Sequence, residues 1–198
     1  FSENNGFKSI IDKIEPRKKS SRIWIAISSV AAVVLLLLYI GFNPKYSQGE
    51  LYSSYYSVPD YEAVPTRGAT PLSPEQEKEA EHAFDYYQKG NFVQASEIFN
   101  AIIEKRTQKE IPEDILFYSS VCMIEMGKTD EAKKNLTYLS ENAKVFAEDA
   151  QWNLALLYLK QGEIEKAKNI FESLAENGRL YEQLSIDILK KIDTKKWF

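Results

Sequence analysis

The sequence is poor in the residues that most enzymes and metal sites use. Of its 198 residues, one is cysteine (Cys122), one is histidine (His82) and two are methionine. A single cysteine excludes an intrachain disulfide, and no cysteine–histidine cluster has the spacing of a metal site. A glycine-rich loop that could cradle a phosphate is also lacking. We therefore expect no catalytic residue, no metal ion and no cofactor, and the sequence favours a protein that is not an enzyme.

The two residues with the most reactive side chains have ordinary explanations. His82 lies among Glu79, Glu81 and Asp85, a pattern typical of the solvated charged face of a helix rather than of a general base held in a pocket. Cys122 falls on the inner side of a predicted helix, so we interpret it as a buried structural thiol.

An excess of positive charge is also lacking in most of the chain. Residues 43–198 contain 19 basic and 26 acidic side chains. Nucleic-acid binding requires clustered lysine and arginine to contact phosphates, so this balance argues against DNA or RNA as a partner. Residues 1–22 differ, because they contain six basic and three acidic side chains.

One long run has no charge at all and predicts a membrane span. Residues Ile23 to Phe42 would form a helix about 30 Å long, which matches the hydrocarbon core of a bilayer. The basic residues Arg17, Lys18, Lys19 and Arg22 precede the run, which predicts a cytoplasmic N-terminus with the rest outside, in the periplasm of a bacterium. A cleaved signal peptide is the alternative, but its apolar core is shorter and is followed by a small-residue cleavage site. We expect a retained anchor in the bacterial inner membrane, contacting lipid through Ile23–Phe42.

The segments on either side of this run have distinct compositions. Residues 1–22 are predicted to be a cytoplasmic juxtamembrane tail, and because the chain begins at Phe1 we expect it to be the C-terminal part of a longer polypeptide. Residues 43–72 are rich in proline and lack a helical period, as a linker does. Disordered linkers contain few aromatic residues. We therefore expect linker contacts, with the following domain or with a partner, through Tyr52, Tyr55, Tyr56 and Tyr61.

An internal repeat dominates residues 73–198. Glycines recur at Gly90, Gly127 and Gly162, which are 37 and 35 residues apart. The same residue types follow each of them: alanine after five residues, then large apolar residues after nine and after twelve. This pattern predicts paired helices at about 74–89 and 92–106, 112–126 and 129–141, and 145–161 and 164–176, with a last amphipathic helix at about 179–192. Ser73 and Gln76 form a capping-box pattern at the start of the first helix.

These hairpins resemble the tetratricopeptide repeat (TPR), most closely in the third copy with its Trp152, Ala155 and Tyr158. The resemblance covers about residues 74–177. It implies an all-α fold: one transmembrane helix followed by a short α-solenoid of about three TPR hairpins and a C-terminal capping helix. It also implies a protein-binding domain without catalytic activity.

In a TPR array, the first helix of each hairpin lines a concave groove that binds proteins. The resemblance places nine residues in this groove: Phe84, Tyr87, Gln88, Phe117, Val121, Ile124, Trp152, Leu156 and Leu159. Alternatively, neighbouring helices, the capping helix or the tyrosine-rich linker cover these residues. Some TPR domains bind a terminal carboxylate through a lysine, asparagine and arginine clamp. The clamp positions here hold Ala80, Phe84, Asp149 and Asn153, which argues against that mode of binding.

The order of segments is similar to that of single-span bacterial inner-membrane proteins with a periplasmic TPR domain, including the ancillary subunit of the secretory translocon. We therefore expect a non-catalytic scaffold or accessory subunit of an inner-membrane complex, whose partners are other proteins, either membrane-complex subunits or exported proteins. A transmembrane regulator, anti-sigma-like or sensor, whose cytoplasmic domain lies outside this chain, is an alternative. A homo-oligomeric structural protein is a second.

Overall fold

The computed structural model describes residues 45–62 and 71–194, and residues 44–194 form one compact unit. The predicted cytoplasmic tail 1–22 and the predicted span 23–42 lie outside the described residues. In the two described ranges, no helix is both long and apolar enough to cross a membrane.

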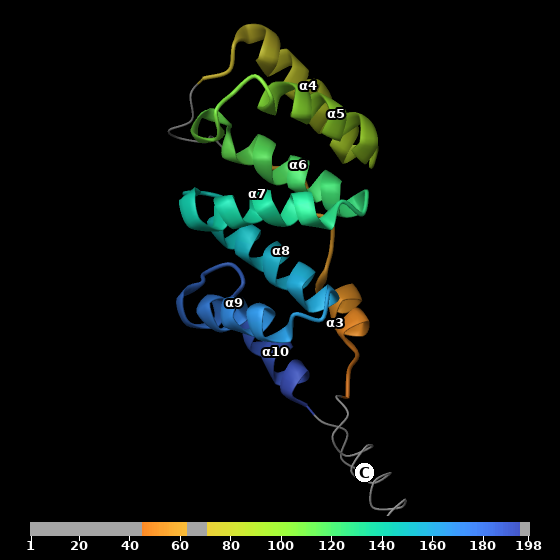
Figure 1. Cartoon of the computed structure of the whole chain (residues 1–198), viewed down its shortest axis with the longest axis vertical. Helices are drawn as coiled ribbons and strands as arrows, with labels where there is room; N and C mark the ends of the chain where they lie inside the picture. The colour runs from red at the N-terminus through yellow and green to blue at the C-terminus, as the bar shows by residue number, and fades with distance from the viewer. Residues whose placement is uncertain (1–44, 63–70, 195–198) are drawn as a thin grey trace, which may run out of the picture. The chain divides into compact units, whose positions relative to one another are not determined.

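All regular secondary structure in the described part of the chain is helical, as the sequence predicts, and this part contains no strand. Its helices are α3 (Gln48–Tyr55), α4 (Pro74–Gln88), α5 (Phe92–Ile103), α6 (Glu113–Glu125), α7 (Thr129–Asn142), α8 (Ala147–Lys160), α9 (Ile164–Asn177) and α10 (Glu182–Asp193), with a short 3₁₀ turn η1 (Gln108–Glu110). From α4 to α10, each helix packs against the next one in the chain, which gives a TPR-like solenoid with α10 at its end (Figure 1).

Local sequence explains where the hairpins begin and turn. Ser73 and Gln76 form the predicted capping box at the start of α4, with Pro74 in the first turn. The three repeat glycines connect the two helices of each hairpin with φ angles of 73°, 76° and 81°. These positive angles lie in the left-handed region, which glycine adopts at little cost because it lacks a Cβ atom.

The small and large repeat residues fill the space between the helices. Ala95, Ala132 and Ala167 are fully buried, so that the two helices of a hairpin pack closely. The large residues Phe99, Leu136 and Phe171, together with Ile102, Leu139 and Leu174, are likewise buried in one continuous core. The sequence period therefore corresponds to a repeated packing unit.

A polar contact recurs between successive hairpins. The Glu113 carboxylate accepts hydrogen bonds from the backbone N–H groups of Lys144 and Val145, at 3.0 and 2.9 Å. Glu148, 35 residues later, accepts bonds from the N–H groups of Arg179 and Leu180 at 2.9 and 2.8 Å. Each carboxylate therefore ties the first helix of a hairpin to the loop that precedes the next first helix.

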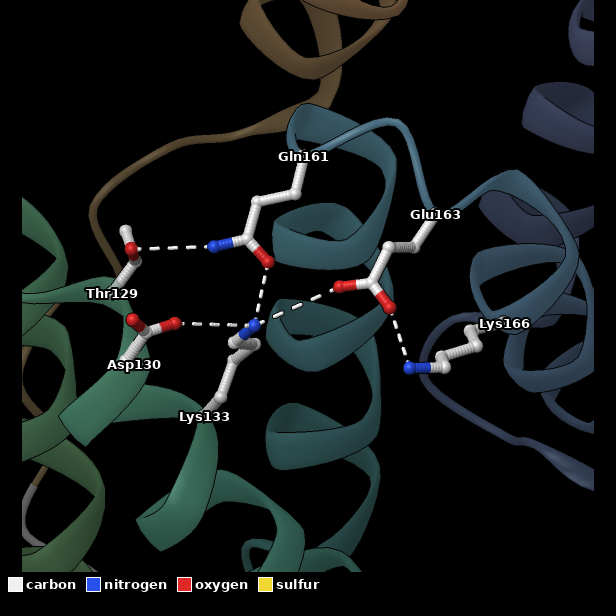
Figure 2. Close-up of polar contacts among 6 residues, drawn as sticks. All are labelled: Thr129, Asp130, Lys133, Gln161, Glu163 and Lys166. Atoms are coloured by element: carbon white, nitrogen blue, oxygen red, sulfur yellow. Dashed lines mark hydrogen bonds and ion pairs between the residues drawn. The ribbon is translucent and has the colours of Figure 1, made fainter.

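A second polar network joins α7, α8 and α9 at their turns (Figure 2). The Lys133 ammonium group donates to Gln161 Oε1 at 2.6 Å and lies 3.3 Å from Asp130 and 3.7 Å from Glu163. Glu163 also pairs with Lys166. One partly buried cation from α7 therefore contacts residues at the end of α8 and the start of α9.

Helix α3 was not predicted from the sequence, because residues 43–72 show no helical period. Ser47 and Glu50 form a capping box that starts this helix, and Leu51 and Tyr52 are its only buried residues. Helix α3 packs against α8 and, less extensively, against α10. A helix with two buried residues produces too short a pattern to be recognised as periodic.

Candidate functional site

The segment that precedes the repeats crosses the array of hairpins. We call residues 45–62 the strap; it consists of residues 45–47, of α3 and of a stretch without regular secondary structure from Tyr56 to Glu62. Its first residue is tied to the far end of the array, because the Lys45 N–H donates to the Thr194 carbonyl at 2.9 Å. From α3 the strap runs along the array towards α6 (Figure 1).

The α3 part of the strap contacts α8 and α10. Tyr52 is buried, and the ammonium group of Lys160 lies 4.4 Å from the centre of its ring. Tyr55 meets Trp152 edge to face, with centroids 6.3 Å apart, and its hydroxyl donates to the Asp187 carboxylate. These contacts combine an apolar ring, a cation over a ring face and a charge-assisted hydrogen bond.

The next strap residue, Tyr56, contacts α6. Its ring stacks on Tyr52 with centroids 4.9 Å apart, and its hydroxyl donates to Glu125 Oε1 at 2.6 Å. Burial raises the pKa of Tyr56 above its ordinary value, and the hydrogen bond to Glu125 raises it further. The protonated hydroxyl is therefore the form that this contact requires.

The end of the strap lies against an aromatic slot formed by Phe84 and Tyr87 of α4 and Tyr118 of α6. Tyr61 stacks on Phe84 with centroids 4.1 Å apart and meets Tyr118 edge to face at 5.3 Å. The slot also binds the strap backbone. The Tyr87 hydroxyl donates to the Pro59 carbonyl at 2.6 Å, and the Tyr118 hydroxyl donates to the Asp60 carbonyl at 3.1 Å.

The same Tyr118 hydroxyl accepts a hydrogen bond from the Glu62 N–H at 3.1 Å. A single hydroxyl therefore contacts the backbone on both sides of Tyr61. The hydrogen bonds of Tyr87 and Tyr118 go to backbone groups and so do not depend on the side chains of the strap, whereas the ring contacts of Tyr61 require an aromatic residue.

Two carboxylates act electrostatically on tyrosines of this contact: Asp114 on Tyr61 and Asp149 on Tyr118. Burial raises the pKa of Asp114 on α6 and of Asp149 on α8 above their ordinary values. Asp149 accepts a hydrogen bond from the Tyr181 hydroxyl at 2.8 Å, which partly offsets the effect of burial on its pKa. Tyr181 in turn stacks on Trp152, with centroids 4.9 Å apart.

The structure places the nine predicted groove residues in three kinds of position. Phe84, Tyr87 and Trp152 contact the strap, and Gln88 is exposed. The remaining five are buried in the core: Phe117, Val121, Ile124, Leu156 and Leu159. The first helices therefore do present an aromatic face, but the strap covers it. The four predicted linker tyrosines, Tyr52, Tyr55, Tyr56 and Tyr61, all lie in this contact.

Sequence reasoning missed three residues that bind the strap by hydrogen bonds: Tyr118, Glu125 and Asp187. On α6 the predicted face was Phe117, Val121 and Ile124, one residue away from the face that contacts the strap. Tyr118 and Glu125 are seven residues apart, two helical turns, so a search for a polar–aromatic pair at that spacing would have found them.

The remaining sequence candidates are His82, Cys122 and the later clamp positions. His82 is exposed. Cys122 is buried as a free thiol, and burial raises its pKa to about 12. At the two later clamp positions, Asp149 binds Tyr181, while the Asn153 side-chain amide donates to the Asp149 backbone carbonyl at 2.8 Å. Within residues 45–62 and 71–194, no group of three or more histidine, cysteine or acidic side chains is placed to hold a metal ion.

Comparison with known proteins gives one family match, which covers part of the helical array. Residues 123–184 match the model of a family described as tetratricopeptide repeat. This match supports the prediction that the chain is a TPR protein. The matched region runs from the end of α6 to the start of α10. Neither curated proteins nor solved structures provide a match to this chain.

Proposed function

We propose that this chain is a non-catalytic scaffold of a bacterial inner-membrane complex, anchored by one helix, whose TPR array binds an extended segment of a partner protein. TPR domains bind other proteins, and the match over residues 123–184 supports that general role. In this proposal, the partner segment occupies the face that the strap covers and exchanges with the strap.

One observation carries the proposal: the array holds an extended segment through its backbone. The hydroxyls of Tyr87 and Tyr118 bind the carbonyls of Pro59 and Asp60, while Tyr61 fills the slot beside Phe84. This is how a groove binds a peptide, with backbone hydrogen bonds for affinity and a side-chain pocket for specificity. A partner segment could make the same contacts after the strap leaves.

The sequence supports the membrane location. Residues 23–42 are long and apolar enough to span a bilayer, and the basic residues before them favour a cytoplasmic N-terminus. The array would then lie in the periplasm, where membrane-complex subunits and exported proteins are available as partners. Resistance of the full chain to alkaline extraction from membranes, with protease reaching the array only after the outer membrane is opened, would support this location. Release by alkali would contradict it.

The binding role is tested by removing two hydroxyls while keeping the rings that pack. The variant Tyr87→Phe with Tyr118→Phe loses the hydrogen bonds to the strap backbone and should lose the same bonds to a partner. Because strap and partner would lose the same bonds, the comparison is made in a chain that also carries Tyr61→Ala, which weakens the competing strap. In that chain we expect the two hydroxyl deletions to lower co-purified partner from solubilised membranes at least fivefold, since each lost bond weakens binding by roughly 1 kcal/mol. The matched control is Tyr86→Phe, because Tyr86 is 37% exposed and lies on the same helix.

The strap also favours a second candidate function, that of a transmembrane regulator. Its first residue, Lys45, follows the predicted span by three residues, and its last residues fill the slot. A partner that displaced Tyr61 would therefore release the segment that leads to the membrane. If partner binding and Tyr61→Ala both change cross-linking at engineered cysteines in residues 43–45, regulation is favoured over simple scaffolding. Unchanged cross-linking would favour the scaffold.

A further inference from the structure

Two loops that connect successive hairpins have nearly the same conformation. One lies between α7 and α8, and the other lies between α9 and α10. Ala143 and Gly178, which follow α7 and α9, both have a φ of −75°, with ψ angles of 151° and 157°. The Glu113 and Glu148 carboxylates then bind the N–H groups of the two loops in the same way. The repeat therefore fixes both loops, and with them the side chains that they present to solvent.

Each loop presents a basic residue followed directly by an apolar one. The pairs are Lys144 with Val145 and Arg179 with Leu180. Val145 is 38% exposed and Leu180 is 68% exposed. The two loops form a pocket of about 430 Å³, which we call the loop pocket and which is lined by both pairs together with Ala147 and Glu148. A pocket of this volume is at the small end of the range for bound ligands, so it accommodates one or two side chains of a partner.

Positive charge faces solvent at the loop pocket, whereas negative charge is turned into the loops. The Arg179 side chain is 92% exposed, but the Glu148 side chain, whose Oε1 lies 3.8 Å from Arg179 Nε, is only 21% exposed. Glu148 also accepts two backbone hydrogen bonds, so its charge is largely compensated. Lys144 is exposed, and no ion pair within residues 45–62 and 71–194 involves its ammonium group. The loop pocket therefore offers two cations to a ligand.

The loop pocket lies at the edge of the array opposite to the edge where α3 packs (Figure 1). It is formed at the first residues of α8, whereas Lys160, the last residue of this helix, contacts Tyr52 of the strap. A helix of 14 residues is about 20 Å long. A ligand could therefore occupy the loop pocket while the strap stays in place.

We propose that the loop pocket binds a segment of a second protein in which an apolar residue stands next to an acidic one. The apolar side chain would pack between Val145 and Leu180, where it is removed from water, and the carboxylate would pair with Lys144 and Arg179. A concave pocket fits a single side chain better than the flat surface of a bilayer. The site goes beyond the proposed function, because the aromatic slot takes no part in it. A scaffold with both sites would bind two segments at once.

The test uses the full chain in phosphatidylcholine nanodiscs and short fluorescent peptides that alternate two residue types. One peptide alternates aspartate and leucine. A second has asparagine in place of aspartate, and a third has serine in place of leucine. By fluorescence polarisation, we expect the aspartate–leucine peptide to bind about fivefold more tightly than either of the others, which is the effect of two exposed charge pairs or of one partly buried side chain. Added salt should reduce the advantage over the asparagine peptide.

Variants of the chain locate the binding. Lys144→Gln with Arg179→Gln removes both cations, and Leu180→Ser removes apolar surface. Each should weaken binding of the aspartate–leucine peptide about fivefold, with circular dichroism unchanged because these side chains are exposed. The matched control is Lys128→Gln with Lys134→Gln, which removes two exposed lysines elsewhere. Tyr87→Phe with Tyr118→Phe, the test of the proposed function, should also leave this binding unchanged.

Three outcomes would overturn the proposal. The first is equal binding of the three peptides, or binding of none. The second is binding that the loop-pocket variants weaken no more than the lysine control does. The third concerns a dye attached at Leu180→Cys, with the buried Cys122 unreacted. If its emission shifts to the blue when the nanodiscs contain phosphatidylglycerol, while the aspartate–leucine peptide does not bind, the loops contact an anionic membrane surface instead of a protein segment.

Discussion

Tyr61 and Phe84 stack with their ring centroids 4.1 Å apart, although one belongs to the strap and the other to the first repeat helix. Phe84 is 7% exposed in this arrangement. Without the strap, the rings of the slot would face solvent, so an aromatic residue at the position of Tyr61 stabilises the first hairpin as well as the strap. The strap is therefore part of the folded unit and at the same time the occupant of the aromatic slot.

This relationship predicts that Tyr61→Ala destabilises the protein. The substitution removes a stacked pair and an edge-to-face pair, and we expect the free energy of unfolding to fall by about 2 kcal/mol. Tyr61→Phe keeps both ring contacts and should stay within about 0.5 kcal/mol of the wild-type chain. Urea unfolding measures both variants. Equal stability of Tyr61→Ala and the wild-type chain would show that the ring contacts contribute nothing.

Alkaline pH should weaken the strap. Burial, followed by the nearby charge of Glu125, raises the pKa of Tyr52 to about 12, whereas an unfolded tyrosine titrates near 10. The unfolded chain therefore loses this proton first, and the free energy of unfolding decreases as pH rises from about 10 towards 12. Below about pH 10 the stability is fully present, and Tyr52 causes no pH dependence. Tyr52→Phe should make the decline between about pH 10 and pH 12 shallower. An identical decline in the variant would contradict this assignment.

The Cys122 thiol should be protected in the native protein. It is buried, and burial raises its pKa to about 12, so that at pH 8 it is neither accessible nor ionised. We expect a thiol reagent to label it only as fast as the array opens, and rapidly in 6 M guanidinium. Immediate labelling of the folded chain at pH 8 would show that α6 is not packed as described.

Two glycine-to-alanine substitutions should change the stability of the protein in opposite directions. Gly127 has a φ of 76°, where an alanine side chain is strained, so Gly127→Ala is expected to destabilise the chain by about 1 kcal/mol. Gly49 lies in helix α3, and a Cβ atom there would meet nothing within 4 Å. Gly49→Ala should therefore stabilise α3 by up to about 1 kcal/mol. Thermal unfolding of both variants checks this, and a shift in the same direction for both would be inconsistent with it.

The Lys133 network should connect the second and third hairpins. Its side chain is only 19% exposed and contacts Gln161, Asp130 and Glu163. Lys133→Met should lower the free energy of unfolding by about 1 kcal/mol, because it removes these contacts from a half-buried site. Lys134→Met, a change to an exposed neighbour, is the control. If the two variants have equal urea midpoints, the network has no measurable role.

The hairpins were predictable because their pattern is local. A glycine at a positive φ, an alanine at a close helix crossing and large residues in the core recur at fixed offsets such as Gly162, Ala167 and Phe171. Each of these requirements applies within one hairpin, so the same residue types recur in every hairpin of the sequence. The same holds for the capping box at Ser73, which depends on four consecutive residues.

The path of the strap was not predictable in the same way. Tyrosines in a proline-rich segment indicated that the segment contacts something, but the pairing of Tyr61 with Phe84 depends on how distant parts of the chain fold together. The choice between Phe117 and Tyr118 as the face of α6 that meets the strap also depends on tertiary packing, because α6 is buried on nearly all sides. When a helix has no polar face, its sequence does not indicate which side packs against a given neighbour.

The most direct test of exchange at the groove is site-specific photo-cross-linking in living cells from a benzoylphenylalanine at position 84, with adducts identified by mass spectrometry. Phe84 contacts Tyr61, so the probe reports whichever segment fills the slot. We expect adducts with residues 57–62 of the same chain and with another protein, and the second class should increase when Tyr61→Ala is introduced. Adducts confined to the chain's own strap, with no second protein even after Tyr61→Ala, would contradict the proposal that the groove binds a partner.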